Sequence, residues 1–246
     1  FSRTGGFMGL SFAVPIDMAM NVANQLRSKG SVSRGWLGVL IQDVTGELAE
    51  SFGMLKPQGA LVAKVLDGSP AEHGGILVGD IVLTYNGQHV TRSSDLPPIV
   101  GASPAGQPAK VEVLRSTPTG AKPVTLSVVT GELPEEGQVA SKAAPPAPPA
   151  NTAKALGATV GTLAKGERES LGVKGQGGVI VRAVGSGPLQ AAGIKQGDVI
   201  LTLNHVPVRD AAHFAEQAKA LPKGKHVPLY IVRDAEPSFL PLKIDP

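Results

Sequence analysis

One pattern of residues occurs twice in this chain of 246 residues, and this repeat limits the possible folds. The first copy runs from Gly59 to Asn86 and the second from Gly178 to Asn204, with the first glycines 119 positions apart. Each copy predicts a strand, a short capped helix, a Gly-Asp turn and a second strand. Two copies at this spacing are too few and too long for a solenoid, so the pattern predicts tandem domains.

Composition fits two small domains of about 90 to 100 residues each. Hydrophobic residues make up 42% of the chain and aromatic residues only 4%, which suits small aliphatic cores. The repeated order of strands and short helices predicts a mostly β fold with short helices, of the α+β class. The net charge is +3, and Lys and Arg are scattered without interleaved aromatic residues, so no nucleic-acid partner is expected.

Several kinds of chemistry are excluded by residue types that the chain lacks. It has no cysteine, which rules out disulfides, thiolate metal sites and a cysteine nucleophile.

No apolar run reaches the roughly 18 residues that a membrane-spanning helix needs. The sequence starts at Phe1 without the pattern of a signal peptide, so we expect that the chain has been cut at its N-terminus.

The chain divides into four segments. Residues 1–31 carry an apolar strand at Gly9–Val14 and an amphipathic helix ending before Gly30, which together cannot close a core. This segment looks like the tail of a larger domain and is expected to pack poorly alone. The remaining segments are a first repeat domain, an Ala/Pro-rich linker expected to be an extended spacer, and a second repeat domain, which cover residues 32–132, 133–154 and 155–246.

Local signals predict the elements of each repeat domain. A Ser-Pro-Ala-Glu sequence at Ser69 is a capping signature, and Asn86-Gly87 is a strong hairpin signal. In the first domain we expect strands at Trp36–Ile41, 111–114 and 124–128 and a second helix at about 93–100. In the second domain we expect a helix at 211–221 and strands at 227–232 and 239–244.

No set of catalytic or metal-binding residues emerges. The Gly185–Pro188 turn looks like a serine-protease nucleophile loop, but it aligns with Asp67–Pro70, which begins a capped helix in the other copy. Asp80 and Asp198 lie in separate domains, at turns where an Asp side chain accepts backbone N–H bonds. No cofactor and no metal are expected, since no metal-binding spacing connects the five histidines, which are His73, His89, His205, His213 and His226.

Peptide binding is the better-supported class of function. The segment Gly35–Val39 places small and apolar residues in a loop that leads directly into a strand. Such a loop can aim several backbone N–H groups at one point and so receive a carboxylate. If the strand lies at a sheet edge, an extended peptide can add to it as a further strand. The alternative is that the alternating residues Leu37, Val39 and Ile41 only serve the core.

Both copies resemble PDZ domains of the circularly permuted bacterial type, over nearly all of 32–244. The resemblance implies partly open β-barrels capped by helices, each with a carboxylate-binding loop beside a groove-facing helix. In the first domain it implies peptide-binding roles for Arg34, Trp36, Leu37, Gly38, Val39, Leu96, Ile99 and Val100. In the second domain it implies them for Leu156, Gly157, Ala158, Phe214 and Ala218, where the match is looser and an insertion follows the loop.

Residues 5–39 resemble a narrower family. They look like the junction between the protease domain and the first PDZ domain of HtrA-type serine proteases, and are most similar to DegP-like and MucD-like periplasmic endoproteases. The resemblance implies that residues 9–14 form the last strand of a chymotrypsin-like barrel. The His, Asp and Ser of that family's triad have no counterpart in this sequence, so we expect the chain alone to be inactive as a hydrolase.

The HtrA resemblance also implies a location and partners. These are the periplasm, protein quality control under stress, and unfolded or misfolded proteins captured through apolar C-terminal peptides. It further implies trimer-based homo-oligomers of the intact protease. Two alternatives remain: an oligomer-assembly scaffold, and the PDZ region of a membrane-embedded metalloprotease or of a secretion component.

Overall fold

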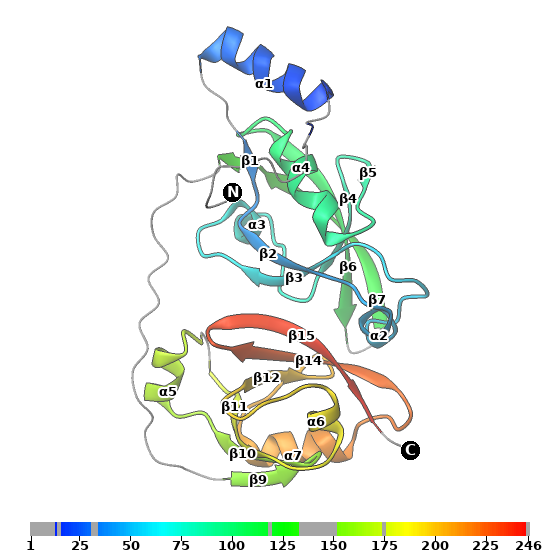
Figure 1. Ribbon diagram of the computed structural model, residues 1–246, viewed down its shortest axis with the longest axis vertical. Coiled ribbons are helices and arrows are strands. Elements are labelled where there is room, and N and C mark those ends of the chain that lie inside the picture. Colours follow the sequence, from blue (N-terminus) through cyan, green and yellow to red (C-terminus); the bar gives the residue numbers. More distant parts are fainter. Residues whose placement is uncertain are drawn as a thin grey trace, which may run out of the picture.

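The computed structural model describes residues 13, 16–30, 34–117, 120–132, 152–173 and 176–244, and contains two β-sheet units (Figure 1). Strands predominate among these residues and the helices are short, so the predicted mostly β class is confirmed. Both larger sheets are open: their outermost strands do not pair with one another. The predicted partly open β-barrels are thus found as open sheets that do not close.

The first unit is built on a sheet of strand order β2-β3-β4-β6-β7, with β5 paired to β4 and a separate pair β1-β8. Its strands are β1 (Gly35–Trp36), β2 (Val39–Asp43), β3 (Ala60–Val65), β4 (Ile81–Tyr85), β5 (Gln88–His89), β6 (Pro108–Thr117), β7 (Gly120–Val129) and β8 (Gly131–Glu132). Its helices are α2 (Gly46–Ser51), α3 (Pro70–His73), the 3-10 turn η1 (Ser93–Asp95) and α4 (Leu96–Gly101).

The second unit repeats this order as β10-β11-β12-β14-β15 and adds one strand, β9, beside β10. Its strands are β9 (Thr152–Ala155), β10 (Ala158–Thr162), β11 (Val179–Val184), β12 (Val199–Leu203), β13 (Val206–Pro207), β14 (His226–Arg233) and β15 (Glu236–Lys243). Its helices are α5 (Lys165–Ser170), α6 (Pro188–Ala191) and α7 (Ala211–Lys219).

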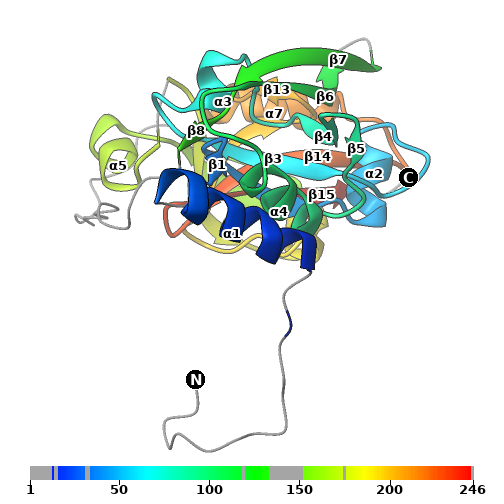
Figure 2. The ribbon, with the colours of Figure 1, turned by 90° about the horizontal axis from the view of Figure 1, so that it is seen from above.

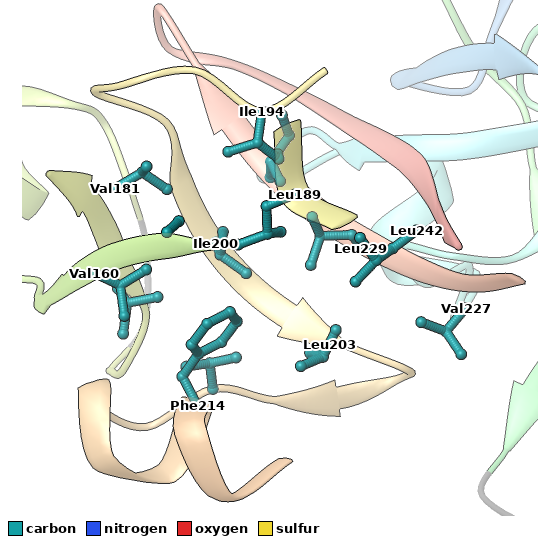
Figure 3. Close-up of a cluster of buried hydrophobic side chains, with 14 of the residues drawn as sticks. Val160, Val181, Leu189, Ile194, Ile200, Leu203, Phe214, Val227, Leu229 and Leu242 are labelled. Carbon is teal, nitrogen blue, oxygen red and sulfur yellow. The ribbon is translucent and has the colours of Figure 1, made fainter. Parts of the chain in front are cut away.

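Each unit buries its own aliphatic core. In the second unit Phe214 of α7 is fully buried and faces Val160 of β10 and Ile200 of β12, as Figure 3 shows. In the first unit the corresponding core gathers Val62, Val82 and other aliphatic side chains around the buried ring of Tyr85. The small aliphatic cores expected from the composition are therefore present in both units.

The repeated Gly-Asp turns carry buried ion pairs. Asp80 is 1% exposed, accepts the amide of Leu77 at 2.9 Å, and accepts two N–H groups of Arg115 at 2.8 and 2.6 Å. In the second unit Asp198 holds Arg233 in the same way, at 2.7 and 2.6 Å. The sequence predicted that these carboxylates accept backbone bonds, but it did not reveal the two arginines.

Several local predictions are confirmed. The Ser69 hydroxyl accepts the amide of Glu72 at 3.2 Å and caps α3. Asn86 and Gly87 both have positive φ, 49° and 78°, and form the hairpin between β4 and β5. One strand was predicted as continuous and is not, because the chain breaks between β1 and β2 at Gly38, where φ is +76°.

Helix α1 (Ile16–Lys29) lies apart from both sheets in Figure 1, and Figure 2 views the molecule from the end at which this helix lies. Its apolar residues Ile16, Met20 and Leu26 are 71%, 52% and 49% exposed, which agrees with the expectation that this segment packs poorly here. The strand predicted at 9–14 falls, apart from residue 13, outside the described residues, as does most of the predicted linker.

The two units touch through α2 and the outer face of the first sheet on one side, and β14 and β15 on the other. Phe239 packs its ring against those of Phe52 and Tyr230. The Gln42 side chain exchanges two hydrogen bonds with the backbone of Phe239, at 3.1 and 2.8 Å. The Tyr230 hydroxyl donates to the carbonyl of Ala63 at 3.0 Å, and burial raises the pKa of Tyr230 to about 12.

Candidate functional site

Strand β2 forms the edge of the first sheet, where its partner among the described residues is β3. Its residues Val39 and Ile41 are half-buried and pack against the same core as Leu96 and Val100 of helix α4. Leu40, on the other face, is 47% exposed. We call the unpaired side of this strand the β2 edge.

The loop before β2 holds its peptide units in a defined direction. The carbonyl of Leu37 accepts the amide of Ala71 at 2.9 Å, and the carbonyl of Gly38 accepts the amide of Leu66 at 2.9 Å. In a trans peptide the N–H points away from the C=O. The amides of Gly38 and Val39, which belong to these two units, therefore point away from α3 and β3.

The strand register supports this direction for Val39. Val39 lies opposite Val65, and the bond from Leu66 to Gly38 marks the pair Val39/Val65 as a non-hydrogen-bonded pair. The backbone of Val39 consequently turns its N–H and C=O toward the β2 edge. Successive amides that point the same way are what a carboxylate-binding loop requires.

Gly38 occupies a position where only glycine fits. Its φ is +76°, and an added Cβ would come within 2.3 Å of the Ser69 Cβ and within 3.0 Å of the Trp36 ring. Trp36 is half-buried and pairs with Gly131 of β8. The loop is thus clamped between the start of α3 and the indole ring. Sequence reasoning did not foresee this contribution of Ser69, which is fully buried.

The far end of β2 is tied to the start of the helical segment. Asp43 accepts the hydroxyl of Ser93 at 2.7 Å and its amide at 3.1 Å. These hydrogen bonds lower the pKa of the Asp43 carboxyl below its usual value. The tie holds η1, and with it α4, beside the end of the strand. Neither residue was predicted, since a strand-terminal Asp carries no distinctive signal.

The structure brings most of the predicted first-domain residues together. The loop lies at the start of β2, and Leu96, Ile99 and Val100 lie on α4 in the same core cluster. Leu96 and Val100 are 2% and 6% exposed and serve the core, whereas Ile99 is half-buried. Arg34 is exposed and precedes the loop.

The second domain contains the same loop. The carbonyl of Leu156 accepts the amide of Leu189 at 3.2 Å, and the carbonyl of Gly157 accepts that of Gly185 at 2.8 Å. Both contacts match those of the first domain, one to the short helix and one to the neighbouring strand, although α6, unlike α3, has no side-chain cap. Helix α7 is also tied to the end of its strand, because the amide of Ala211 donates to the Thr162 hydroxyl at 3.1 Å.

The edge of the second domain is nevertheless closed. Strand β9 pairs antiparallel with β10, with Ala155 opposite Ala158 and Thr152 opposite Gly161. The condition for strand addition, a strand at the sheet edge, is therefore not met by β10, because β9 occupies that position. Three of the four residues of β9 come from the stretch that was predicted to be linker. Phe214 is fully buried in the core and Ala218 is half-buried on α7.

The candidate site is made of backbone groups and apolar side chains. Among the described residues, no group of three or more His, Asp or Glu side chains is placed to hold a metal ion. Within the same residues no helix combines the length and the hydropathy needed to cross a bilayer. The arrangement is suited to receiving an extended peptide.

The chain is similar to one protein-family model and to several known proteins. A family model described as "PDZ domain" matches residues 35–130 and 155–244. The chain is 45% identical over 244 residues to a "probable periplasmic serine endoprotease DegP-like" of Pseudomonas savastanoi pv. phaseolicola, covering 99% of this chain and 50% of that relative. It is also 45% identical over 246 residues to the protein of the same description from Hahella chejuensis, covering 100% of this chain and 51% of the relative.

A solved structure of the HtrA-type protease AlgW with a decapeptide is similar at 36% identity and a TM-score of 0.46. It covers 55% of this chain and 41% of that one. The chain spans about half the length of the curated relatives it matches.

Proposed function

Since this chain belongs to the PDZ domain family, with two matching domains, we propose that it captures extended polypeptide segments by strand addition at the β2 edge. The peptide backbone pairs with β2, and a terminal carboxylate is received by the amides of Gly38 and Val39. Side chains at alternate positions of the peptide contact Val39, Ile41 and the exposed part of Ile99.

One observation carries this proposal. The carbonyls on both sides of Gly38 are bonded within the domain, so the amides of Gly38 and Val39 are directed to the side where β2 has no partner among the described residues. A loop that served only the core would have no need of this arrangement. The alternative that these residues are core alone therefore has less support.

The relatives named above suggest where this capture takes place. We propose that the chain is the C-terminal half of a periplasmic serine endoprotease, in which residues 1–31 complete the protease domain. There the β2 edge would tether unfolded or misfolded proteins through their apolar C-termini. The exposed apolar residues of α1 would pack against that domain, and the assembled protease would be a trimer-based oligomer.

Isothermal titration tests the proposal with two acetylated hexapeptides that end in three apolar residues. One has a free C-terminal carboxylate and the other is amidated. We expect micromolar binding of the acid and at least roughly tenfold weaker binding of the amide, because the charged hydrogen bonds are lost. Equal affinities would contradict the carboxylate-binding role of the loop.

A pair of variants locates the binding. Ile99→Glu places a charge on the helix beside the β2 edge and should abolish binding of the acid peptide by repulsion and lost apolar contact. Pro98→Glu introduces the same charge at the neighbouring, exposed position and should leave the affinity within about twofold. Loss of binding in both variants, or in neither, would count against this location.

A further inference from the structure

The two domains differ in the path of the chain before their shared loop. In the first domain Gly35 and Trp36 pair with β8, and among the described residues no segment before the loop runs along β2. In the second domain the four residues of β9 run directly along β10 (Figure 1). Within the part of the chain that the structure describes, the position that an added peptide would take is thus open in the first domain and filled by the chain itself in the second.

The backbone of one residue accounts for this difference. Leu37 has a negative φ, whereas Leu156 has φ of +51° and is followed by Gly157 at +81°. Two successive left-handed residues between paired strands form the turn typical of tight two-residue hairpins. Leu156 therefore folds β9 back onto β10, although Leu seldom adopts this conformation.

Strand β9 makes both kinds of contact that a strand-adding peptide makes. Along its backbone, Ala155 lies opposite Ala158, whose amide turns away from β11 for the same reason as that of Val39 turns away from β3. On its inner face, Ala153 and Ala155 are half-buried against the core of the domain, and the strand lies against helix α7. Thr152 and Lys154 are exposed on the outer face.

From these contacts we propose that residues 152–155 are a built-in ligand of the second domain, so that this domain accepts an external peptide only when β9 is released. The inference rests on the proposed function, because it assumes that strand addition is how these domains bind. The segment that occupies the peptide position beside β10 is this chain's own Thr-Ala-Lys-Ala sequence, Thr152–Ala155.

The hairpin gives this internal ligand a strong advantage over a free one. A segment joined to its site by a two-residue turn has an effective concentration in the millimolar range or above. An external peptide binds only the fraction of molecules in which the site is open, and its apparent affinity falls by that fraction.

The test uses the full chain and a peptide of its own residues 150–156 with a free carboxylate. Binding is followed by NMR at the amides of Ala158 and Val160 in β10, which face β9. We expect no shift in the wild-type chain with peptide at about 1 mM. In Ala153→Glu, which places a charge on the inner face of β9, we expect these amides to lose protection from hydrogen exchange and to respond to the peptide with at least tenfold higher affinity.

Lys154→Glu is the matched control, since it makes the same change on the exposed face of the same strand. It should behave as the wild type. A second opened variant, in which residues 152–155 are replaced by Gly-Ser-Gly-Ser, adds no buried charge and should also bind the peptide. Dispersed signals of the second domain, Phe214 included, confirm that each variant is folded.

The inference is overturned if the opened variants bind the peptide no better than the wild type, or if their β10 amides stay as protected as before. The amide of Val39 reports separately on the first domain. If the Val39 amide does not shift with an apolar peptide, the proposed function is contradicted. If the amide shifts and the exchange protection of Ala158 and Val160 do not change when β9 is opened, this inference is contradicted.

Discussion

The β2 edge of the first domain and strand β10 of the second domain have the same surroundings at both ends of the strand. Both begin with a Leu-Gly loop whose carbonyls are bonded to a short helix and to the neighbouring strand. Both end in a tie between the strand and the following helical segment. They differ in the chain that enters the loop: among the described residues it leaves β2 without a second partner strand, whereas in the second domain it covers β10 with β9.

This difference shows that separate parts of the sequence determine the loop and whether the strand after it is free to pair with a peptide. The loop and its hydrogen bonds come from the repeated residues. Whether the strand is free depends on the φ angle of the residue before the glycine, which is negative at Leu37 and positive at Leu156. A left-handed conformation costs a non-glycine residue roughly 1–2 kcal/mol, so the pairing and burial of β9 must offset that strain.

The largest expected effect is the loss of stability when the Asp–Arg pair at the Gly-Asp turn, which both domains contain, is broken. Arg115→Ala and Arg233→Ala each leave a buried aspartate unpaired, so each should lower the free energy of unfolding of its own domain by about 3–5 kcal/mol. Urea denaturation measures both, with the fluorescence of Trp36, the single tryptophan, reporting on the first domain.

Lys110→Ala is the control, because its 3.3 Å ion pair to Glu112 is at the surface, with side chains 65% and 42% exposed. It should change the free energy of unfolding by less than about 1 kcal/mol. If the arginine variants were as mild as this control, or if only one domain responded, the two turns would not be equivalent.

The second prediction separates the two loops. Leu37 is 3% exposed, so Leu37→Gly removes a core side chain and should destabilise the first domain by about 2–5 kcal/mol. Leu156 is half-buried and strained, so relief of its left-handed conformation should offset part of the loss in Leu156→Gly. Chemical denaturation should show the Leu156 variant to be the milder by about 2 kcal/mol, and equal losses would argue against the strained turn.

The smallest expected effect is a pH dependence of the tie at the end of β2. Hydrogen bonds from Ser93 lower the pKa of Asp43 from its ordinary 3.8, so the tie is complete above that value and weakens as the pH falls through the lower, folded-state pKa. In the second domain the Thr162 hydroxyl makes the tie and does not titrate in this range.

An NMR titration of the Asp43 carboxyl in the wild type and in Ser93→Ala measures this effect. The pKa of Asp43 should rise toward 3.8 when the Ser93 hydroxyl is removed. An unchanged pKa would show that the hydroxyl does not stabilise the carboxylate.

Much of the fold follows from local sequence signals. The Ser69 cap and the Asn86-Gly87 hairpin were predicted because each depends on a few adjacent residues with strong preferences. The position of the first loop was predicted from the repeat together with the Leu-Gly-Val pattern. The resemblance to PDZ domains then supplied the helix residues beside it.

The rest depends on long-range pairing, which local signals do not report. Strand β9 follows an Ala/Pro-rich stretch and has two alanines and a lysine, which are weak strand formers, so its sequence indicates a linker. Its pairing is stabilised by contacts with β10 and α7 and requires a left-handed Leu156, which no propensity would predict. The arginine partners of Asp80 and Asp198 lie 35 residues away in sequence and were missed for the same reason.

The most direct test of the account is an NMR titration of the unmodified chain with the apolar, free-carboxylate hexapeptide. The amides of Val39 and Ile41 should shift in a saturable way, while those of Ala158 and Val160 stay in place. Shifts confined to Ala158 and Val160, with Val39 unmoved, would contradict the assignment of an open and a closed edge.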